Sequence, residues 1–236
     1  MPDGTCFLCG DSYTKRGMAR HLQSCLADTA SSGEDSAAII QIVGEHRPDY
    51  WLYVAIAPST TLATLDEFLR GFWVECCGHL SAFTIDGVQY DRPHDEDAPA
   101  GFGPPPQSMD VPLDEVLENV DDATFGYEYD FGTTTALSVS VVETGSWGDD
   151  AIASSLVKDV SPVENVIVLA RNEQPERTCA DCGDQATVVC QPCLRDPDAG
   201  AYFCESCADA HDDGEGYHAF LPVVNSPRSG VCGYRG

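Results

Sequence analysis

Apolar residues between positions 37 and 172 follow two periods, one typical of strands and one typical of helices. Stretches rich in β-branched and aromatic residues predict strands at 38–43, 50–57, 80–85, 88–90, 125–131, 134–142 and 163–170. Asp86-Gly87 predicts a hairpin, because this dipeptide accommodates the positive φ angles of a tight turn. The strands do not alternate regularly with helices, so we expect an α+β fold with a central mixed sheet.

Two short segments carry apolar residues at helical spacing. Thr64-Leu65-Asp66-Glu67 has the pattern of a capping box and predicts a helix that begins there and runs to about Trp73. Asp110 is expected to cap a second short helix, with Pro112 in its first turn. These two helices are the only ones that the pattern predicts for the central domain.

Composition divides the chain into parts. Residues 27–36 are rich in Ser, Ala and acids and predict a linker. Residues 91–110 are rich in acids, Pro and Gly and predict a surface loop. We therefore expect a small cysteine-containing unit at 1–26, an α+β domain at 37–172 and a cysteine-rich unit at 177–236.

Three Cys-x-x-Cys pairs followed by two histidines fill residues 179–218. Two residues between paired cysteines let the backbone turn so that both thiolates reach one zinc ion at about 2.3 Å. Eight such ligands predict two tetrahedral zinc sites, in preference to a disulfide cluster or an iron site. The candidate ligands are Cys179, Cys182, Cys190, Cys193, Cys204, Cys207, His211 and His218.

This stretch resembles a B-box-type zinc finger, although the loop between Cys193 and Cys204 is longer than is usual in that family. The resemblance implies an interleaved pairing, in which Cys179, Cys182, Cys204 and Cys207 hold one ion and Cys190, Cys193, His211 and His218 hold the other. A sequential pairing is the alternative, because Cys207 and His211 are four residues apart and would share one face of a helix.

A second candidate zinc site lies at the start of the chain, at Cys6, Cys9, His21 and Cys25. The last two are four residues apart, so a helix would direct both toward a turn made by the first two. Tyr13, Met18 and Leu22 supply an apolar plug. The segment resembles a ββα zinc finger whose last histidine is replaced by cysteine, which brings the expected number of zinc ions to three.

The N-terminal finger is basic in an otherwise acidic chain. Lys15, Arg16 and Arg20 outnumber Asp3 and Asp11 there, which makes this finger the part of the chain best suited to contact phosphate. A single finger reads only about three base pairs, and the rest of the protein would repel a duplex. We therefore expect a structural or protein-binding role for it, with nucleic-acid binding as the alternative.

Three other residues have side chains that could serve as a nucleophile, a metal ligand or a base. Cys232 is more typical of a packed thiol or a spare zinc ligand than of a nucleophile. His79 lies near Cys76 and Cys77, but the spacing is poor for a tetrahedral site, so we expect a core histidine bonded to backbone. Asp130 is expected to stabilise a turn through side-chain-to-backbone bonds and not to act as a base. No catalytic residue is predicted.

Charge is the most unusual feature of the composition. The 236 residues carry 39 acids against 12 bases, a net charge of -27, yet 43% of them are hydrophobic. This composition predicts a folded protein adapted to a salt-rich cytoplasm. The first residues lack the pattern of a signal peptide, and no apolar run is long enough to cross a membrane. In the cytoplasm thiols stay reduced, which favours metal binding by clustered cysteines.

The central domain resembles the plasmid pRi ORF-three-like family, also called the insertion-element passenger TnpR family, over roughly residues 38–145. The resemblance depends on Trp73 followed by His79-Leu80 and Phe83, and on Phe125-Gly-Tyr-Glu-Tyr-Asp130-Phe-Gly132. The family implies no defined activity. Polar and aromatic positions that usually follow the last glycine are replaced here by Thr133, Thr134, Thr135 and Leu137.

The sequence as a whole favours a zinc-binding, non-enzymatic adaptor or regulator with a protein partner. Between Arg177 and Ala219 there are nine acids and two arginines, a charge that favours proteins over nucleic acid as partners. The apolar, turn-rich tail at 221–234 is expected to pack over the C-terminal zinc unit. The alternatives are a mobile-element-associated enzyme or accessory that uses the central domain, and a DNA-binding regulator that uses the N-terminal finger.

Overall fold

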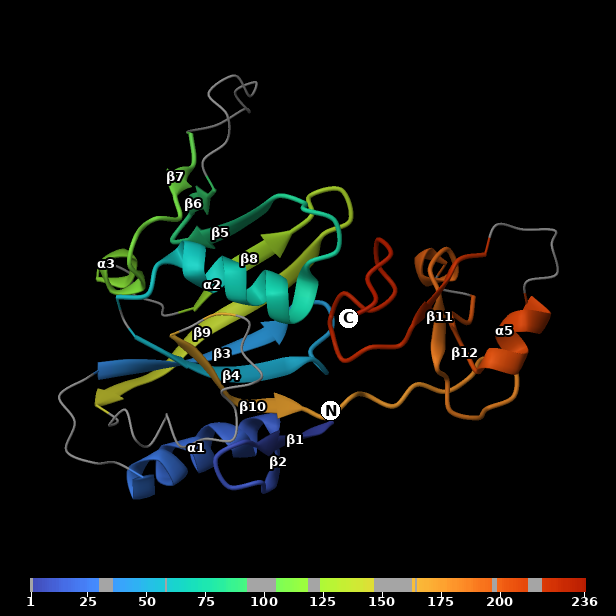
Figure 1. Ribbon diagram of the computed structural model, residues 1–236, viewed down its shortest axis with the longest axis horizontal. Coiled ribbons are helices and arrows are strands. Elements are labelled where there is room, and N and C mark those ends of the chain that lie inside the picture. The colour runs from blue at the N-terminus through green and yellow to red at the C-terminus, as the bar shows by residue number, and fades with distance from the viewer. Residues whose placement is uncertain are drawn as a thin grey trace.

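A computed structural model describes residues 2–29, 36–57, 59–92, 105–118, 124–146, 163, 165–196, 199–211 and 218–236. Residues 30–35 of the predicted linker at 27–36 fall outside these ranges. Residues 93–104 of the predicted loop at 91–110 also fall outside them. The fold is α+β, as the sequence predicts, with a large sheet and few short helices (Figure 1). Clusters of cysteine and histidine side chains lie toward both ends of the chain.

Ten strands form the main sheet in the order β2-β1-β10-β4-β3-β9-β8-β5-β6-β7. Neighbouring strands are antiparallel except β6 and β7, which are parallel. Their bounds are β1 Asp3–Cys6, β2 Ser12–Thr14, β3 Ser36–Gly44, β4 Trp51–Ile56, β5 Ser81–Ile85, β6 Val88–Asp91, β7 Gln107–Ser108, β8 Thr124–Tyr129, β9 Thr135–Ser146 and β10 Val166–Asn172. The strands predicted for the central domain all correspond to strands of this sheet.

The two faces of the sheet are covered by different helices (Figure 1). Alternate residues of β3 and β4 point to opposite faces, as the pleat of a strand requires. Ile40 and Leu52 pack on one face in a cluster with helix α2, Leu62–Leu69. Ile39 and Trp51 pack on the other face in a cluster with helix α1, Lys15–Thr29. Both central strands are consequently buried on both sides.

The N-terminal finger is part of the main sheet. Its hairpin of β1 and β2 precedes α1, which gives the ββα order that the resemblance to a ββα zinc finger implies. Strand β1 pairs with β10, and Cys6 lies opposite Ala170. Helix α1 continues through Thr29, beyond the predicted end of the finger. The finger thus shares hydrogen bonds and a core with the α+β domain.

Both predicted helix starts in the central domain were wrong. The first helix is capped by Thr61, whose side chain accepts a hydrogen bond from the Thr64 backbone, so Thr64 lies inside the first turn. It continues as a π-helical turn, η1, over Arg70–Val74. The second helix, α3, spans Leu113–Leu117 with Pro112 at its N-cap in place of Asp110, because the extended backbone of a residue before a helix suits the fixed φ of proline.

The predicted hairpin at Asp86-Gly87 is confirmed. Both residues have positive φ angles, 48° and 76°, between β5 and β6. These are the angles that the Asp-Gly pair accommodates at least cost.

A three-stranded sheet in the order β12-β11-β13 forms the C-terminal module, which we define as residues 177–222. It contains β11 Val188–Cys190, the 3-10 turn η2 Cys193–Arg195, β12 Tyr202–Phe203, α5 Glu205–His211 and β13 Phe220–Pro222. This module lies beside the main sheet (Figure 1). Its buried apolar cluster consists of Cys179, Cys190, Cys193, Phe203 and Ala208.

The tail, residues 223–236, runs from the module onto the central domain (Figure 1). Asn225 exchanges hydrogen bonds with Asn172, and its carbonyl accepts from the indole of Trp73. Gly230 lies against Val189 and Leu194 of the module, where there is no room for a Cβ atom. The tail therefore packs over the C-terminal module, as expected, and also joins it to the main sheet.

Within the described ranges, the helices are too short or too polar to cross a membrane.

Candidate metal centres

Four groups of cysteine and histidine side chains have their ligand atoms gathered within 4.8 Å of one another, a spacing that suits a metal ion. They are Cys6, Cys9, His21 and Cys25; Cys76, Cys77, His79 and Cys232; Cys179, Cys182, Cys204 and Cys207; and Cys190, Cys193, His211 and His218. All 12 cysteines of the chain belong to these groups. Each group offers four ligands, the number that a tetrahedral zinc site requires.

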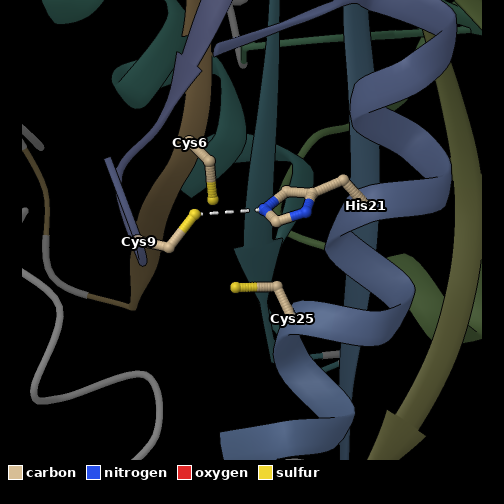
Figure 2. Close-up of side chains that lie close together, drawn as sticks. All are labelled: Cys6, Cys9, His21 and Cys25. Carbon is tan, nitrogen blue, oxygen red and sulfur yellow. Dashed lines mark hydrogen bonds between the residues drawn. The ribbon is translucent and has the colours of Figure 1, made fainter. Parts of the chain in front are cut away.

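The N-terminal group brings a turn of the hairpin together with one face of α1 (Figure 2). Cys6 ends β1, Cys9 follows in the turn, and Gly10 has a positive φ of 85°. His21 and Cys25 are one helical turn apart on α1, and the His21 Nε2 atom lies 3.2 Å from Cys9 Sγ. The structure thus places the four residues predicted from spacing around one point.

Surrounding side chains fix the N-terminal group in place. The ring of Tyr13 stacks on His21 with centroids 4.2 Å apart, and Met18 and Leu22 are buried below it. Burial and the neighbouring thiols raise the pKa of Cys25 to about 12. Zinc binds the thiolate, so a metal ion entering this group must displace a proton from Cys25.

The first group of the C-terminal module joins two Cys-x-x-Cys turns. The Sγ atoms of Cys182 and Cys204 are 3.7 Å apart. Gly183, with φ of 81°, follows the first turn, and its N–H donates to the carbonyl of Cys179. The Cys182 backbone N–H also helps to lower the pKa of the Cys179 thiol to about 6, which favours the thiolate that a metal binds.

The second group joins the remaining turn to the two histidines. Cys190 Sγ lies 3.6 Å from His218 Nδ1, and Cys193 Sγ lies 3.5 Å from His211 Nε2. The geometry therefore groups the eight ligands in the interleaved pattern and not in the sequential one. Although Cys207 and His211 both lie on α5, they face different groups, because each pairs with a different Cys-x-x-Cys turn.

Cys190 and Cys193 are bonded to each other as a disulfide. At this pair the structure differs from the expectation that the cysteines are metal-binding thiolates. Zinc binds thiolates, so this group can hold zinc only after the pair is reduced.

The remaining group was not predicted as a site. His79 was expected to be a core histidine bonded to backbone, but its side chain is 33% exposed and its Nε2 atom lies 3.0 Å from Cys77 Sγ and 3.2 Å from Cys232 Sγ. Spacing argued against a site because Cys76, Cys77 and His79 are too close in sequence to surround an ion. The fourth ligand comes from the tail, 155 residues after Cys77.

A buried ion pair lies beside this group. Arg228 is fully buried and donates to Asp130 at 2.6 Å and to Cys76 Sγ at 3.3 Å. Asp130 also accepts from the backbone N–H groups of Gly132 and Thr133, which confirms its expected role in a turn. Burial opposes ionisation, but the hydrogen bonds from Thr133 and Arg228 outweigh it and hold the pKa of Asp130 well below its usual range.

The basic residues of the N-terminal finger lie at the start of α1. Arg16 and Arg20 are exposed and four residues apart, so they share one face of the helix. Lys15 is half-buried, and its carbonyl accepts from the Tyr53 hydroxyl. Two of the three predicted phosphate-binding side chains are thus presented together to solvent.

No family model matches this chain, and no curated protein matches it. Among solved structures, the chain is similar to the crystal structure of MM3350, a protein of unknown function from Methanosarcina mazei Go1, with 16% sequence identity and a TM-score of 0.43. The similarity covers 64% of this chain and 75% of the other. A likeness this distant does not identify a family or a function.

Proposed function

We propose that this protein is a zinc-binding, non-enzymatic adaptor or regulator that binds a protein partner through its C-terminal module. The main support is the number of protein ligands: the N-terminal group and the first group of the module each supply four, and the second group supplies four once the Cys190–Cys193 disulfide is reduced. Catalytic zinc sites keep one position open for water or substrate, whereas structural sites are closed by four protein ligands. Closed sites stabilise a surface and leave no place on the metal for a reaction.

Cobalt substitution tests whether the sites are closed. Co²⁺ in a tetrahedral thiolate site has a characteristic visible spectrum, and an external ligand such as azide changes that spectrum only where it can bind the metal. We expect the spectrum of the cobalt protein to be unchanged by azide. A spectrum that shifts with azide concentration would reveal an open position and would contradict the non-enzymatic proposal.

The surface charge of the C-terminal module indicates the kind of partner. Asp181, Asp184, Glu205 and Asp209 are all exposed on it. An acidic surface steers and selects a basic protein surface and repels nucleic acid. We therefore propose a protein partner that offers clustered lysines or arginines.

Charge neutralisation tests the assignment of the partner surface. A variant with Asp181→Asn, Asp184→Asn, Glu205→Gln and Asp209→Asn is compared with a control that neutralises four exposed acids of the central domain, Glu67, Asp86, Asp110 and Glu128. Proteins cross-linked to the wild type in its own lysate should be lost from the first variant and kept by the control. Equal retention by both variants would contradict binding through the module.

An enzyme that uses the central domain is less well supported. Asp130 is the carboxylate best placed to act as a base, but it is buried and paired with Arg228. Its lowered pKa makes it a weak base, since a general base works best with a pKa near the working pH.

A DNA-binding regulator is the second candidate, and the exposed pair of Arg16 and Arg20 on α1 favours it. Two arginines on one helical face can reach neighbouring phosphates. Their small number against a net charge of -27 predicts weak binding that is highly sensitive to salt.

Family and location are also proposals. In the segment similar to the plasmid pRi ORF-three-like family, the motif residues Trp73, Phe83 and Tyr127 are buried in one core, which is consistent with a structural role for the motif. The acidic composition supports a salt-rich cytoplasm, because excess carboxylates keep a protein hydrated and dispersed at high ionic strength. Unfolding measured across a salt series tests this: the protein should be most stable at high salt.

A further inference from the structure

The group formed by Cys76, Cys77, His79 and Cys232 links two distant parts of the chain. The first three lie in the turn between η1 and β5, on the central domain, and Cys232 lies in the tail. Cys77 Sγ is 3.3 Å from Cys76 Sγ and 3.7 Å from Cys232 Sγ. His79 Nε2 is 3.2 Å from Cys232 Sγ, so the tail cysteine closes the group.

The four ligand atoms lie as close together as the ligands of one tetrahedral zinc ion, and the 3.7 Å between Cys77 Sγ and Cys232 Sγ equals the expected sulfur–sulfur distance, whereas Cys76 Sγ and Cys77 Sγ are closer, at 3.3 Å. With zinc–sulfur bonds of about 2.3 Å, two sulfur ligands of one zinc ion lie roughly 3.7–3.8 Å apart. The four ligand atoms meet the same 4.8 Å limit as the three groups predicted from sequence. Three thiolates and one imidazole are ligands that favour zinc over harder cations.

The backbone on both sides is shaped to present these ligands. Gly78, between Cys77 and His79, has φ of 72°, and its N–H donates to Glu75 at 2.5 Å. In the tail, Cys232 itself has φ of 47°, between Gly230 at 83° and Gly233 at 72°. A non-glycine residue in this conformation is strained and persists where the surroundings hold it. A bond from Cys232 Sγ to a metal ion would hold it.

Charge around the group also suits a zinc–thiolate centre. Three thiolates exceed the charge of Zn²⁺ by one unit, and buried Arg228, whose charge is shared with Asp130, donates an N–H to Cys76 Sγ at 3.3 Å. Such a donor orients a ligand, as outer partners of metal ligands do. Asp130 lies 3.6 Å from His79 Nε2 but is itself paired with Arg228. A cavity of about 280 Å³ borders Cys232.

We propose that Cys76, Cys77, His79 and Cys232 bind a fourth zinc ion, which clamps the C-terminal tail to the central domain. Hydrogen bonds already hold Asn225 and Ser226 against Asn172 and Trp73. The zinc ion fixes the tail a few residues further on, where Cys232 meets the turn before β5. The tail in turn carries the C-terminal module, so this ion joins the module to the main sheet.

Native mass spectrometry of the full-length chain, purified reduced, tests the fourth site by counting bound zinc. Cys77→Ser, Cys232→Ser and the double variant should each hold one zinc ion fewer than the wild type, and the double variant should lose no more than either single variant. His79→Ala should also lose one, whereas His46→Ala is the matched control, because His46 is exposed and outside the four groups.

Three results would overturn the proposal. The first is a zinc count that Cys77→Ser, Cys232→Ser and His79→Ala all fail to lower. The second is a loss of two ions in the double variant, which would place the two cysteines at separate sites. The third is a stable Cys77–Cys232 disulfide in the reduced preparation, detected as a cross-linked peptide that contains both residues, because a remaining Cys190–Cys193 disulfide would lower the intact mass by the same two hydrogens. Should a cysteine variant fail to fold, the comparison of His79→Ala with His46→Ala decides the question alone.

Discussion

The N-terminal finger and the C-terminal module contain similar metal ligands but very different amounts of apolar core. In the finger, Met18, Leu22 and Leu26 are buried against Trp51 and other residues of the main sheet. In the module, three of the five residues of the buried cluster are the cysteines themselves, and Phe203 is its one large side chain. A metal ion bound in the finger would therefore supplement an apolar core, whereas one bound in the module would replace it.

This difference follows from size. A unit of about 40 residues cannot bury enough apolar surface to fold alone and needs a metal or disulfides. The finger does not have to fold alone, because β1 pairs with β10 and α1 shares the core of a larger domain. Folding of the C-terminal module should consequently depend on metal binding more than folding of the N-terminal finger does.

The largest expected effect is that of removing metal from the module. Binding at structural zinc sites contributes on the order of 10–16 kcal/mol to folding. Chelation under reducing conditions should abolish amide hydrogen-exchange protection in β11, β12 and α5 while β3 and β4 keep theirs. Protection that persists in β11 after complete metal removal would show that the module has a sufficient core of its own.

In the finger, apolar burial should matter more than in the module. Leu22→Ala removes a side chain that is 1% exposed and should lower the free energy of unfolding by about 2–5 kcal/mol. Urea titration followed through tryptophan fluorescence measures this change. The neighbouring exposed Gln23→Ala is the control, with an expected change within about 0.5 kcal/mol. Equal effects of the two would mean that α1 is not packed as described.

A matched pair of ligand variants compares the two regions directly. Cys25→Ser and Cys207→Ser should each release one zinc ion. The finger variant should keep α1 docked, because Met18 and Leu22 remain buried, whereas the module variant should lose α5. Hydrogen exchange of the two helices distinguishes these outcomes. Loss of α1 together with its zinc would erase the proposed difference.

The smallest effect concerns nucleic acid. If the finger contacts a duplex, binding should weaken steeply with salt, and Arg16→Ala with Arg20→Ala should reduce the slope of log K against log salt by roughly two. Arg195→Ala removes an exposed arginine from the acidic module and should leave the slope unchanged. Absence of salt-dependent binding by the wild type would remove DNA contact as a function of the finger.

Local patterns in the sequence predicted most of the fold. Strands are visible because β-branched and aromatic residues gather in short runs, and Asp86-Gly87 marks its hairpin. Helix starts were less accurate, because Thr61 and Thr64 both have side chains able to cap, and burial of Leu62 decides in favour of the earlier one. Such choices depend on tertiary packing, which a local pattern does not contain.

Groupings of distant residues that follow no known ligand pattern could not be predicted. The pairing of Cys6 with Ala170 across β1 and β10 has no local signal. The group that includes His79 was not predicted because the spacing of Cys76, Cys77 and His79 is poor for a tetrahedral site. The fold supplies the fourth ligand, Cys232, from a distant part of the chain. A count of the cysteines could have indicated this group. The three predicted sites use nine of the 12 cysteines and leave Cys76, Cys77 and Cys232, which the structure brings together.

The number of zinc ions bound to the reduced wild-type chain is the most direct test of the account. Native mass spectrometry, checked by elemental analysis, should find four zinc ions per chain, one for each group of ligands. Three would contradict the clamp at Cys232 and leave the two terminal units intact. A well-folded, reduced protein without zinc would contradict the central claim that metal holds the C-terminal module together.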